Sequence, residues 1–245
     1  MKNRFKQRLI YYSILTFSTL FLLNGCKEEK KSYKYGDLAT SAVGETDKEI
    51  SKHGFIEIYE HIFSPLKDST TRFCEIGIGR GGSLIMWSNF FKNADIFGID
   101  IFKMTHLNTK RIKTYITDQS KKDQLKKFIE DSGGNFDIIL DDGGHAMDQQ
   151  QISFGYLFKH IKPGGYYIIE DVHTSLPLHS KGYGISDDEK NATLLMINNY
   201  IKTREIKSNY LTEEEIKYLN DNIYYCNLFF KNNNIQSITC VIKKK

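Results

Sequence analysis

The sequence predicts an α/β fold with a doubly wound, mostly parallel seven-stranded sheet that ends in an antiparallel C-terminal hairpin. Short apolar runs alternate with helical stretches, which is typical of parallel strands joined by crossover helices. A glycine-rich segment directly follows the first of these runs, where such folds bind ligands. Two β-like runs joined by an asparagine-rich turn end the chain, and this pattern favours a hairpin. With 245 residues, the chain is long enough for one such domain.

The first 26 residues have the layout of a secretory signal. A basic start precedes the apolar run Leu9–Leu23, and Leu-Asn-Gly-Cys26 then resembles the lipobox of bacterial lipoproteins. The run is shorter than the roughly 20 residues that a membrane-spanning helix prefers. We expect residues 1–26 to be a lipoprotein signal that attaches the protein to a membrane through acylated Cys26. The alternatives are an uncleaved membrane-binding helix and a location on the cytoplasmic face or in the cytoplasm. Residues 27–45 predict a polar tether, and residues 46–245 predict the folded domain.

The charge and the cysteines exclude other classes of protein. The net charge is +4, but the first 34 residues hold eight lysines and arginines against two glutamates, a local +6 that leaves −2 for the rest. Such a domain has no basic footprint for nucleic acid. The spacing of cysteine and histidine does not suggest zinc. Cys74, Cys226 and Cys240 fall within predicted strands, where buried reduced thiols are expected.

Taken in order, the domain begins with a helix from Thr46, for which Thr46 and Glu49 form a capping box. The predicted strands cover residues 73–76, 95–100, 113–117, 136–140 and 166–169. Helices over residues 84–91, after Ser120 and over residues 149–160 connect them. Helices ending near Thr203 and Asn220, the second capped by Thr212 and Glu215, lead to the hairpin of residues 223–230 and 235–242.

The glycine-rich segment Phe73–Ser83 predicts a loop that holds a nucleotide. Glycine lets the backbone turn sharply and approach a ligand before the next helix begins. One pattern in the segment is the GxGxxG of dinucleotide enzymes, formed by Gly77, Gly79 and Gly82. The other is ExGxGxG, formed by Glu75, Gly77, Gly79 and Gly81. The second pattern resembles the first motif of class I S-adenosylmethionine-dependent methyltransferases, so the segment alone leaves two cofactors open.

The ends of the second and third strands carry polar residues. Asp100 ends the second strand about 20 residues after the glycine loop, where an acid can bind ribose hydroxyls in either class of enzyme. Asp118 and Gln119 directly follow the third strand. The carboxyl ends of parallel strands meet at one edge of the sheet, so these residues are candidates for the same nucleotide site.

A cluster of acids follows the fourth and fifth strands. Because neighbouring strands lie about 4.8 Å apart, Asp142 and His145 are expected beside Glu170 and Asp171. Crowded carboxylates repel one another unless a cation lies among them, and oxygen ligands suit Mg²⁺, Mn²⁺ or Ca²⁺. We expect His145, on the same rim, to be a base. Asp141 points to the other face of its strand and is expected to cap a turn or helix.

Together these segments resemble the macrocin O-methyltransferase family and its cephalosporin-hydroxylase-like relatives, over roughly Thr46 to Ser175. The motifs come in order and are Glu75-Ile-Gly-Ile-Gly-Arg-Gly-Gly-Ser83 with Trp87, Gly98-Ile-Asp-Ile101, Asp118-Gln-Ser120, Asp141-Asp-Gly-Gly-His145, and Pro163-Gly-Gly-Tyr-Tyr-Ile-Ile-Glu-Asp171 with His173-Thr-Ser175. The resemblance implies a class I methyltransferase (Rossmann-like) fold, S-adenosylmethionine as donor, Mg²⁺, and a sugar hydroxyl as acceptor.

Site roles carried over from the family fall on matching positions. The metal ligands would be Asp142, Glu170 and Asp171, and His145 would be the general base. The cofactor site would comprise Glu75, Gly77, Gly79, Gly81, Ser83, Asp100, Asp118 and Gln119. The chain departs from the family after Ser175, where Leu-Pro-Leu replaces an aromatic residue, so the acceptor pocket does not transfer. It departs also at its N-terminus, because the family is cytoplasmic.

The hypothesis is therefore a Mg²⁺-dependent O-methyltransferase that acts on a sugar-containing small molecule or glycan, with membrane attachment through its N-terminal segment and possible homo-oligomerisation. The alternative is a lipid-anchored protein of the same fold that is catalytically inactive and binds envelope glycans. The signal supports this alternative, because an exported domain would meet little S-adenosylmethionine, whereas the intact acid cluster opposes it. An NAD-dependent enzyme is disfavoured by Glu75 and by the C-terminal hairpin.

Overall fold

The computed structural model describes residues 36–41, 46, 48, 54–176, 179, 191–231 and 234–245, with the side chains of residues 231 and 234–237 excepted. All of them belong to one compact unit, Gly36–Lys245. The predicted signal with Cys26 lies outside the described residues. Within the described ranges, no helix combines the length and the apolar character needed to cross a membrane.

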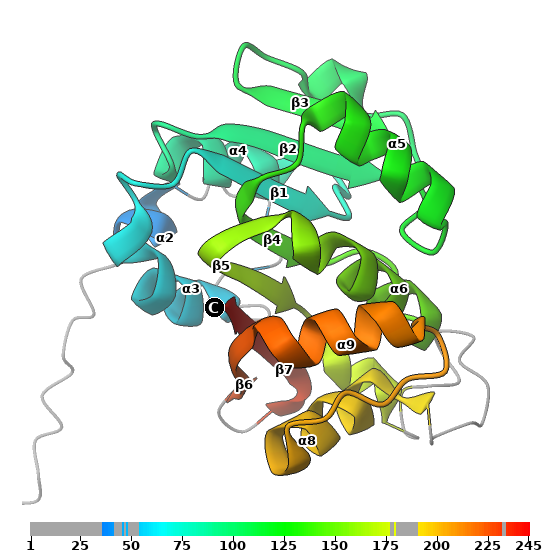
Figure 1. Ribbon diagram of the computed structural model, residues 1–245. Helices are drawn as coiled ribbons and strands as arrows, with labels where there is room; N and C mark the ends of the chain where they lie inside the picture. Colours follow the sequence, from blue (N-terminus) through cyan, green and yellow to red (C-terminus); the bar gives the residue numbers. More distant parts are fainter. Residues whose placement is uncertain are drawn as a thin grey trace, which may run out of the picture. The chain divides into compact units, whose positions relative to one another are not determined.

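A seven-stranded sheet in the order β3-β2-β1-β4-β5-β7-β6 forms the centre of this unit (Figure 1). The strands are β1 (Arg72–Ile76), β2 (Asp95–Asp100), β3 (Ile112–Ile116), β4 (Phe136–Asp141), β5 (Ile161–Ile169), β6 (Ile223–Lys231) and β7 (Asn234–Lys244). The first five strands pair in parallel, whereas β7 runs antiparallel to both β5 and β6. The predicted fold class, including the C-terminal hairpin, is confirmed.

Helices cover both faces of the sheet, because successive residues of a strand point to opposite sides. One face packs against α2 (Asp37–Ser41), α3 (Phe55–Phe63) and α4 (Gly82–Phe90). Aromatic rings dominate there. The ring of Phe73 in β1 is tilted by 34° against that of Trp87 in α4, with 4.8 Å between the ring centroids. The other face packs against α5 (Lys122–Ser132), α6 (Met147–Leu157), α8 (Thr193–Thr203) and α9 (Glu213–Asn222). Figure 1 shows these two groups of helices on either side of the strands.

The N-terminal part of the domain differs from the prediction. The helix expected from Thr46 begins at Phe55, because Gly54 takes a left-handed conformation with φ 71° before it. The expected tether of residues 27–45 includes the helix α2. Its residue Leu38 is fully buried, and the backbone N–H of Leu38 donates to the Glu60 carboxylate at 2.7 Å. The helix α2 thus belongs to the compact unit Gly36–Lys245.

Later elements agree more closely with the prediction. Thr212 and Glu215 form the expected capping box at the start of α9, with hydrogen bonds of 3.2 and 2.8 Å. The three cysteines of the strands are buried free thiols, as expected. β5 starts at Ile161, because the Pro-Gly-Gly segment forms an irregularity within the strand rather than a turn before it.

Candidate active site

The glycine-rich loop joins β1 to α4 and passes close to the end of β4. Three glycines of the loop, Gly77, Gly79 and Gly81, have positive φ angles of 83°, 52° and 86°, which residues other than glycine rarely adopt. A Cβ on Gly77 would lie 2.2 Å from the carbonyl oxygen of Asp142. Only glycine therefore allows this loop to lie against the segment that follows β4.

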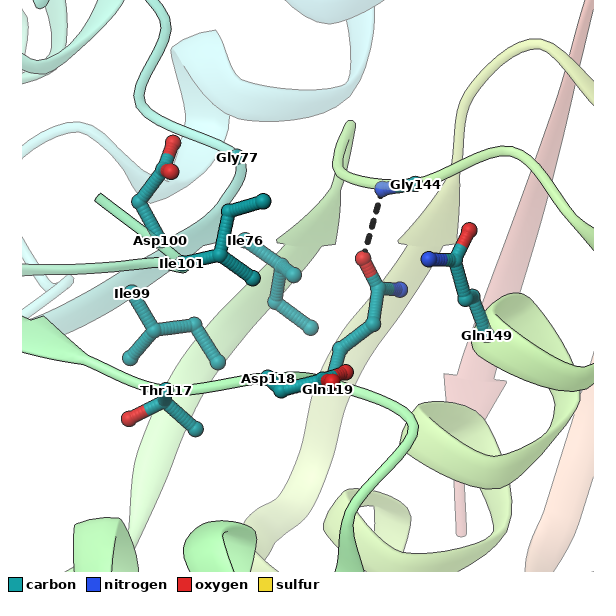
Figure 2. A pocket seen from close by; sticks show the side chains of 10 residues that line it. All are labelled: Ile76, Gly77, Ile99, Asp100, Ile101, Thr117, Asp118, Gln119, Gly144 and Gln149. Carbon is teal, nitrogen blue, oxygen red and sulfur yellow. Dashed lines mark hydrogen bonds between the residues drawn. The ribbon is translucent and has the colours of Figure 1, made fainter. Parts of the chain in front are cut away.

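A pocket opens at the carboxyl ends of β1, β2 and β3 (Figure 2). Its lining consists of Ile76, Gly77, Ile99, Asp100, Ile101, Thr117, Asp118, Gln119, Gly144 and Gln149. Four of the eight predicted cofactor residues are among them, namely Gly77, Asp100, Asp118 and Gln119. The sheet order reverses between β1 and β4 beside this pocket, and parallel α/β sheets bind nucleotides at such a point.

Asp100 ties the end of β2 to the glycine loop. One of its carboxylate oxygens accepts the backbone N–H of Ile78 at 2.8 Å, and the other accepts that of Phe102 at 2.9 Å. A carboxylate offers about four lone-pair sites, so these bonds orient Asp100 and leave acceptor capacity toward the pocket. The arrangement suits a ligand that presents hydroxyl groups.

Gln119 connects the pocket to the segment after β4. Its Oε1 accepts the backbone N–H of Gly144 at 2.7 Å (Figure 2), and its Nε2 donates to the buried Asp141 at 3.0 Å. Asp141 also accepts from Ser153 at 2.6 Å and from the turn N–H of Gly143 at 3.3 Å. Burial raises the pKa of Asp141 to about 6 in spite of these donors. Asp141 thus holds the turn and Gln119 in place from beneath, as its position on the strand predicted.

Glu75 and Ser83 lie beneath the glycine loop rather than in the lining of the pocket. The Ser83 hydroxyl donates to Glu75 at 2.7 Å, and the indole N–H of Trp87 donates to it at 3.2 Å. Glu75 is fully buried, and burial raises its pKa to about 7. These two predicted cofactor residues therefore fix the start of α4, and Gly79 and Gly81 shape the loop itself.

The acid cluster lies where β4 and β5 end, next to the pocket. Asp141 pairs with Ile169 in the sheet, so that Asp142 and Glu170 follow side by side. The hydroxyl of Thr174 donates to the backbone carbonyl of His145 at 3.0 Å and so joins the two segments. The juxtaposition expected from the order of the strands is present.

A buried lysine that the sequence analysis missed lies inside this cluster. The Lys48 ammonium is 2.6 Å from Asp142, 3.1 Å from Glu170 and 3.7 Å from Glu75, and its side chain is fully buried. Residue 48 falls in a stretch that was expected to be helical, where a lysine is ordinarily a solvent-facing residue. No local pattern distinguishes such a lysine, so only the tertiary fold shows its role.

Glu170 is bound on a second side by Tyr59 of α3, whose hydroxyl donates to it at 2.6 Å. Burial and the neighbouring Asp142 raise the pKa of Glu170 well above its ordinary value. Glu170 was predicted to share a metal with Asp142 and Asp171, and this stays a prediction. In the structure its carboxylate accepts hydrogen bonds from Lys48 and Tyr59.

One ligand atom each from Asp142, His145 and Asp171 lies within 4.8 Å of the others, a grouping that could hold a metal ion. His145 Nε2 is 3.7 Å from one Asp171 oxygen, and His173 Nδ1 is 3.6 Å from the other. Asp171 has a left-handed backbone with φ 53°, which residues other than glycine seldom adopt. The carboxylates of Asp142 and Asp171 offer the oxygen ligands that Mg²⁺ and Mn²⁺ prefer, and the His145 imidazole lies beside them. Glu170, the third predicted ligand, follows β5 next to Asp142.

No family model matches the chain. Among curated proteins it is similar to the demethylmacrocin O-methyltransferase of Streptomyces fradiae, with 34% identity over 185 residues, 73% of this chain and 45% of the relative. It is 38% identical over 157 residues to the 8-demethyl-8-(2-methoxy-alpha-L-rhamnosyl)-tetracenomycin-C 3'-O-methyltransferase of Streptomyces olivaceus, 61% of this chain and 39% of the relative. The mycinamicin VI 2''-O-methyltransferase of Micromonospora griseorubida is 38% identical over 130 residues, 50% of this chain and 32% of the relative.

The comparison with solved structures also finds a methyltransferase. The MycE methyltransferase of the mycinamycin biosynthetic pathway, in complex with Mg, SAH and mycinamycin VI, superposes with a TM-score of 0.68 and 28% identity over 86% of this chain and 55% of that one. The chain thus spans less than half the length of these curated relatives and about half of MycE. The resemblance to macrocin O-methyltransferases and the class I methyltransferase fold are confirmed.

Proposed function

We propose, from this resemblance and from the geometry of the site, that the protein is an S-adenosylmethionine- and Mg²⁺-dependent O-methyltransferase that acts on a sugar hydroxyl. One observation carries the proposal: Gly144 lines the pocket at the glycine loop, and the next residue, His145, belongs to the grouping of Asp142 and Asp171. A nucleotide-type pocket and a hard-metal site thus meet within one turn of the chain. Methyl transfer would require the donor and the acceptor hydroxyl to lie this close to each other.

The pocket at β1 to β3 would hold the methyl donor. Asp100 would accept hydroxyl groups of a ribose, and Gly77, which lines the pocket, would present its backbone to the donor. Gln119 keeps Gly144 in position, so that the wall of the pocket nearest His145 is fixed before any ligand binds. When bound, the donor supplies an electrophilic methyl group, and the residues of this chain contribute mainly its orientation.

Asp142 and Asp171 would hold the metal, with His145 beside them and Glu170 as a further acid of the cluster. When bound, Mg²⁺ lowers the pKa of a coordinated hydroxyl. The His145 imidazole would accept the proton of that hydroxyl. The imidazolium so formed lies next to the Asp171 carboxylate, which stabilises its charge.

The acceptor class is proposed from the relatives, whose names describe methylation of sugar-bearing macrolides and tetracenomycins. The test incubates the full chain with methyl-labelled S-adenosylmethionine, Mg²⁺, and macrolides with or without their deoxysugars. Label should enter only the glycosylated acceptors. Its transfer should stop when EDTA is added and resume when Mg²⁺ is added back. Equal labelling of the sugar-free aglycones, or labelling that persists in EDTA, would contradict the proposal.

The N-terminal Leu-Asn-Gly-Cys26 supports a second proposal, that the protein is a membrane-attached lipoprotein. In that case the domain could be a glycan-binding protein without catalysis. A globomycin-sensitive shift in electrophoretic mobility, absent from the Cys26→Ala variant, is expected. If neither protein shifts, the chain is not processed as a lipoprotein.

A further inference from the structure

Lys48 is the cation already present within the acid cluster. Its ammonium contacts both oxygens of Glu170, at 3.1 and 3.2 Å, and one oxygen of Asp142 at 2.6 Å. The side chain has no exposed surface. A charged lysine is rarely buried to this extent unless it is paired, and here the three acids Glu75, Asp142 and Glu170 surround it.

Asp142 belongs both to the surroundings of Lys48 and to the grouping that fits a metal. A divalent ion bound through this carboxylate would lie only a few ångströms from the ammonium, and two cations at that separation repel each other strongly in a buried site. Glu170 could turn toward such an ion only after it releases Lys48. The same acids therefore cannot bind both cations well.

We propose that Lys48 is an internal counter-cation that holds the acid cluster closed and that a divalent metal displaces on binding. This inference rests on the proposed metal site and adds a competitor from the chain itself. The displacement is linked to α3, because the backbone carbonyl of Lys48 accepts the N–H of Ile56 at 3.2 Å and Tyr59 binds Glu170. Metal binding would thus also loosen the start of this helix.

The first test measures the reactivity of Lys48 in the unmodified protein. The full chain is treated briefly with an acetylating reagent, with and without Mn²⁺, and the modification of each lysine is read by mass spectrometry. A buried amine reacts only when its surroundings open, so Mn²⁺ should raise the labelling of Lys48 by about tenfold. Lys244 is the matched control, because it is also buried but bonds the backbone carbonyls of Phe158 and Ile161. Its labelling should not change.

The second test measures Mn²⁺ affinity in Lys48→Met, which keeps the length of the side chain and removes its charge. If Lys48 leaves the cluster less than about a tenth of the time, its removal should tighten Mn²⁺ binding by at least about tenfold. The control Lys162→Met removes a lysine that pairs with Asp137 at the other end of β4, and should bind Mn²⁺ like the parent protein. Asp142→Asn should abolish both the binding and the labelling response.

The outcomes distinguish failure of the displacement of Lys48 from failure of the proposed metal site. Weaker or unchanged Mn²⁺ affinity in Lys48→Met would contradict competition between Lys48 and the metal. Weaker affinity would mean that Lys48 positions the metal ligands, and unchanged affinity that it has no effect on them. Tighter binding without increased labelling of Lys48 would also overturn displacement, because it would show only relief of charge repulsion. If neither protein binds Mn²⁺, the proposed metal dependence fails as well.

Discussion

Replacing His145 with alanine is expected to lower the rate of methyl transfer by about 10²- to 10⁴-fold, the range typical for loss of a general base. The imidazole lies at the rim of the acid cluster, 3.7 Å from Asp171, and its chain neighbour Gly144 lines the cofactor pocket. Without it, the acceptor hydroxyl has no positioned group to take its proton. S-adenosylmethionine should still bind, because the side chain of His145 is outside the lining of the pocket.

The assay follows labelled methyl transfer at saturating donor, together with Mn²⁺ affinity. His61→Ala, a change of an exposed histidine on α3, is the matched control and should leave the rate unchanged. Mn²⁺ affinity decides between two roles of His145. If His145 is only a base, its loss leaves the Mn²⁺ affinity nearly unchanged. If it is a metal ligand, its loss lowers that affinity strongly. Near-normal turnover in His145→Ala would remove this residue from the mechanism.

Replacing Gly77 with alanine is expected to weaken S-adenosylmethionine binding by more than about tenfold and to lower the free energy of unfolding by about 1–3 kcal/mol. Gly77 has φ 83°, and the added Cβ would lie 2.2 Å from the carbonyl oxygen of Asp142 and 2.6 Å from Cα of Gly143. Both are backbone atoms, so the loop or the end of β4 must move. Either movement separates the pocket from the acid cluster.

The matched control is Gly164→Ala. Gly164 lies in β5 with φ 78°, but among the described residues no atom comes within 4 Å of its added Cβ. This variant carries the left-handed strain without the collision, so it should lose about 1 kcal/mol of stability and no affinity for S-adenosylmethionine. Equal losses of affinity in both variants would show that the contact of Gly77 with Asp142 is unimportant for the pocket.

The fold was predictable because its signals are local. Each central strand is a short apolar run, buried on both faces, and turn residues bound it. The order of the strand ends then brought Asp142 and Glu170 together, as the register of β4 and β5 confirms. The position of Asp100 was also predictable, because the end of β2 lies beside the glycine loop, where its carboxylate accepts the backbone N–H of Ile78.

The roles of individual acids were less predictable, because side-chain direction after a strand depends on tertiary contacts. Glu75 fits the glycine pattern, yet it faces Ser83 and Trp87 beneath the loop. Glu170 accepts from Tyr59, a residue more than a hundred positions away in the chain. Such partners leave no trace in local spacing.

Lys48 was missed for a related reason. The stretch around it was expected to form one helix from Thr46, in which a lysine faces solvent. The helix α3 instead starts at Phe55, after the left-handed Gly54, and residue 48 lies outside it.

The most direct test of the central claim is calorimetric titration of S-adenosylmethionine into the full chain with Mg²⁺, with NAD⁺ titrated in parallel. The same titration into His145→Ala and Gly77→Ala locates the binding. Micromolar binding of S-adenosylmethionine alone, kept in His145→Ala and lost in Gly77→Ala, is the predicted result. Binding of NAD⁺ instead, or of neither ligand, would contradict the assignment as a methyltransferase.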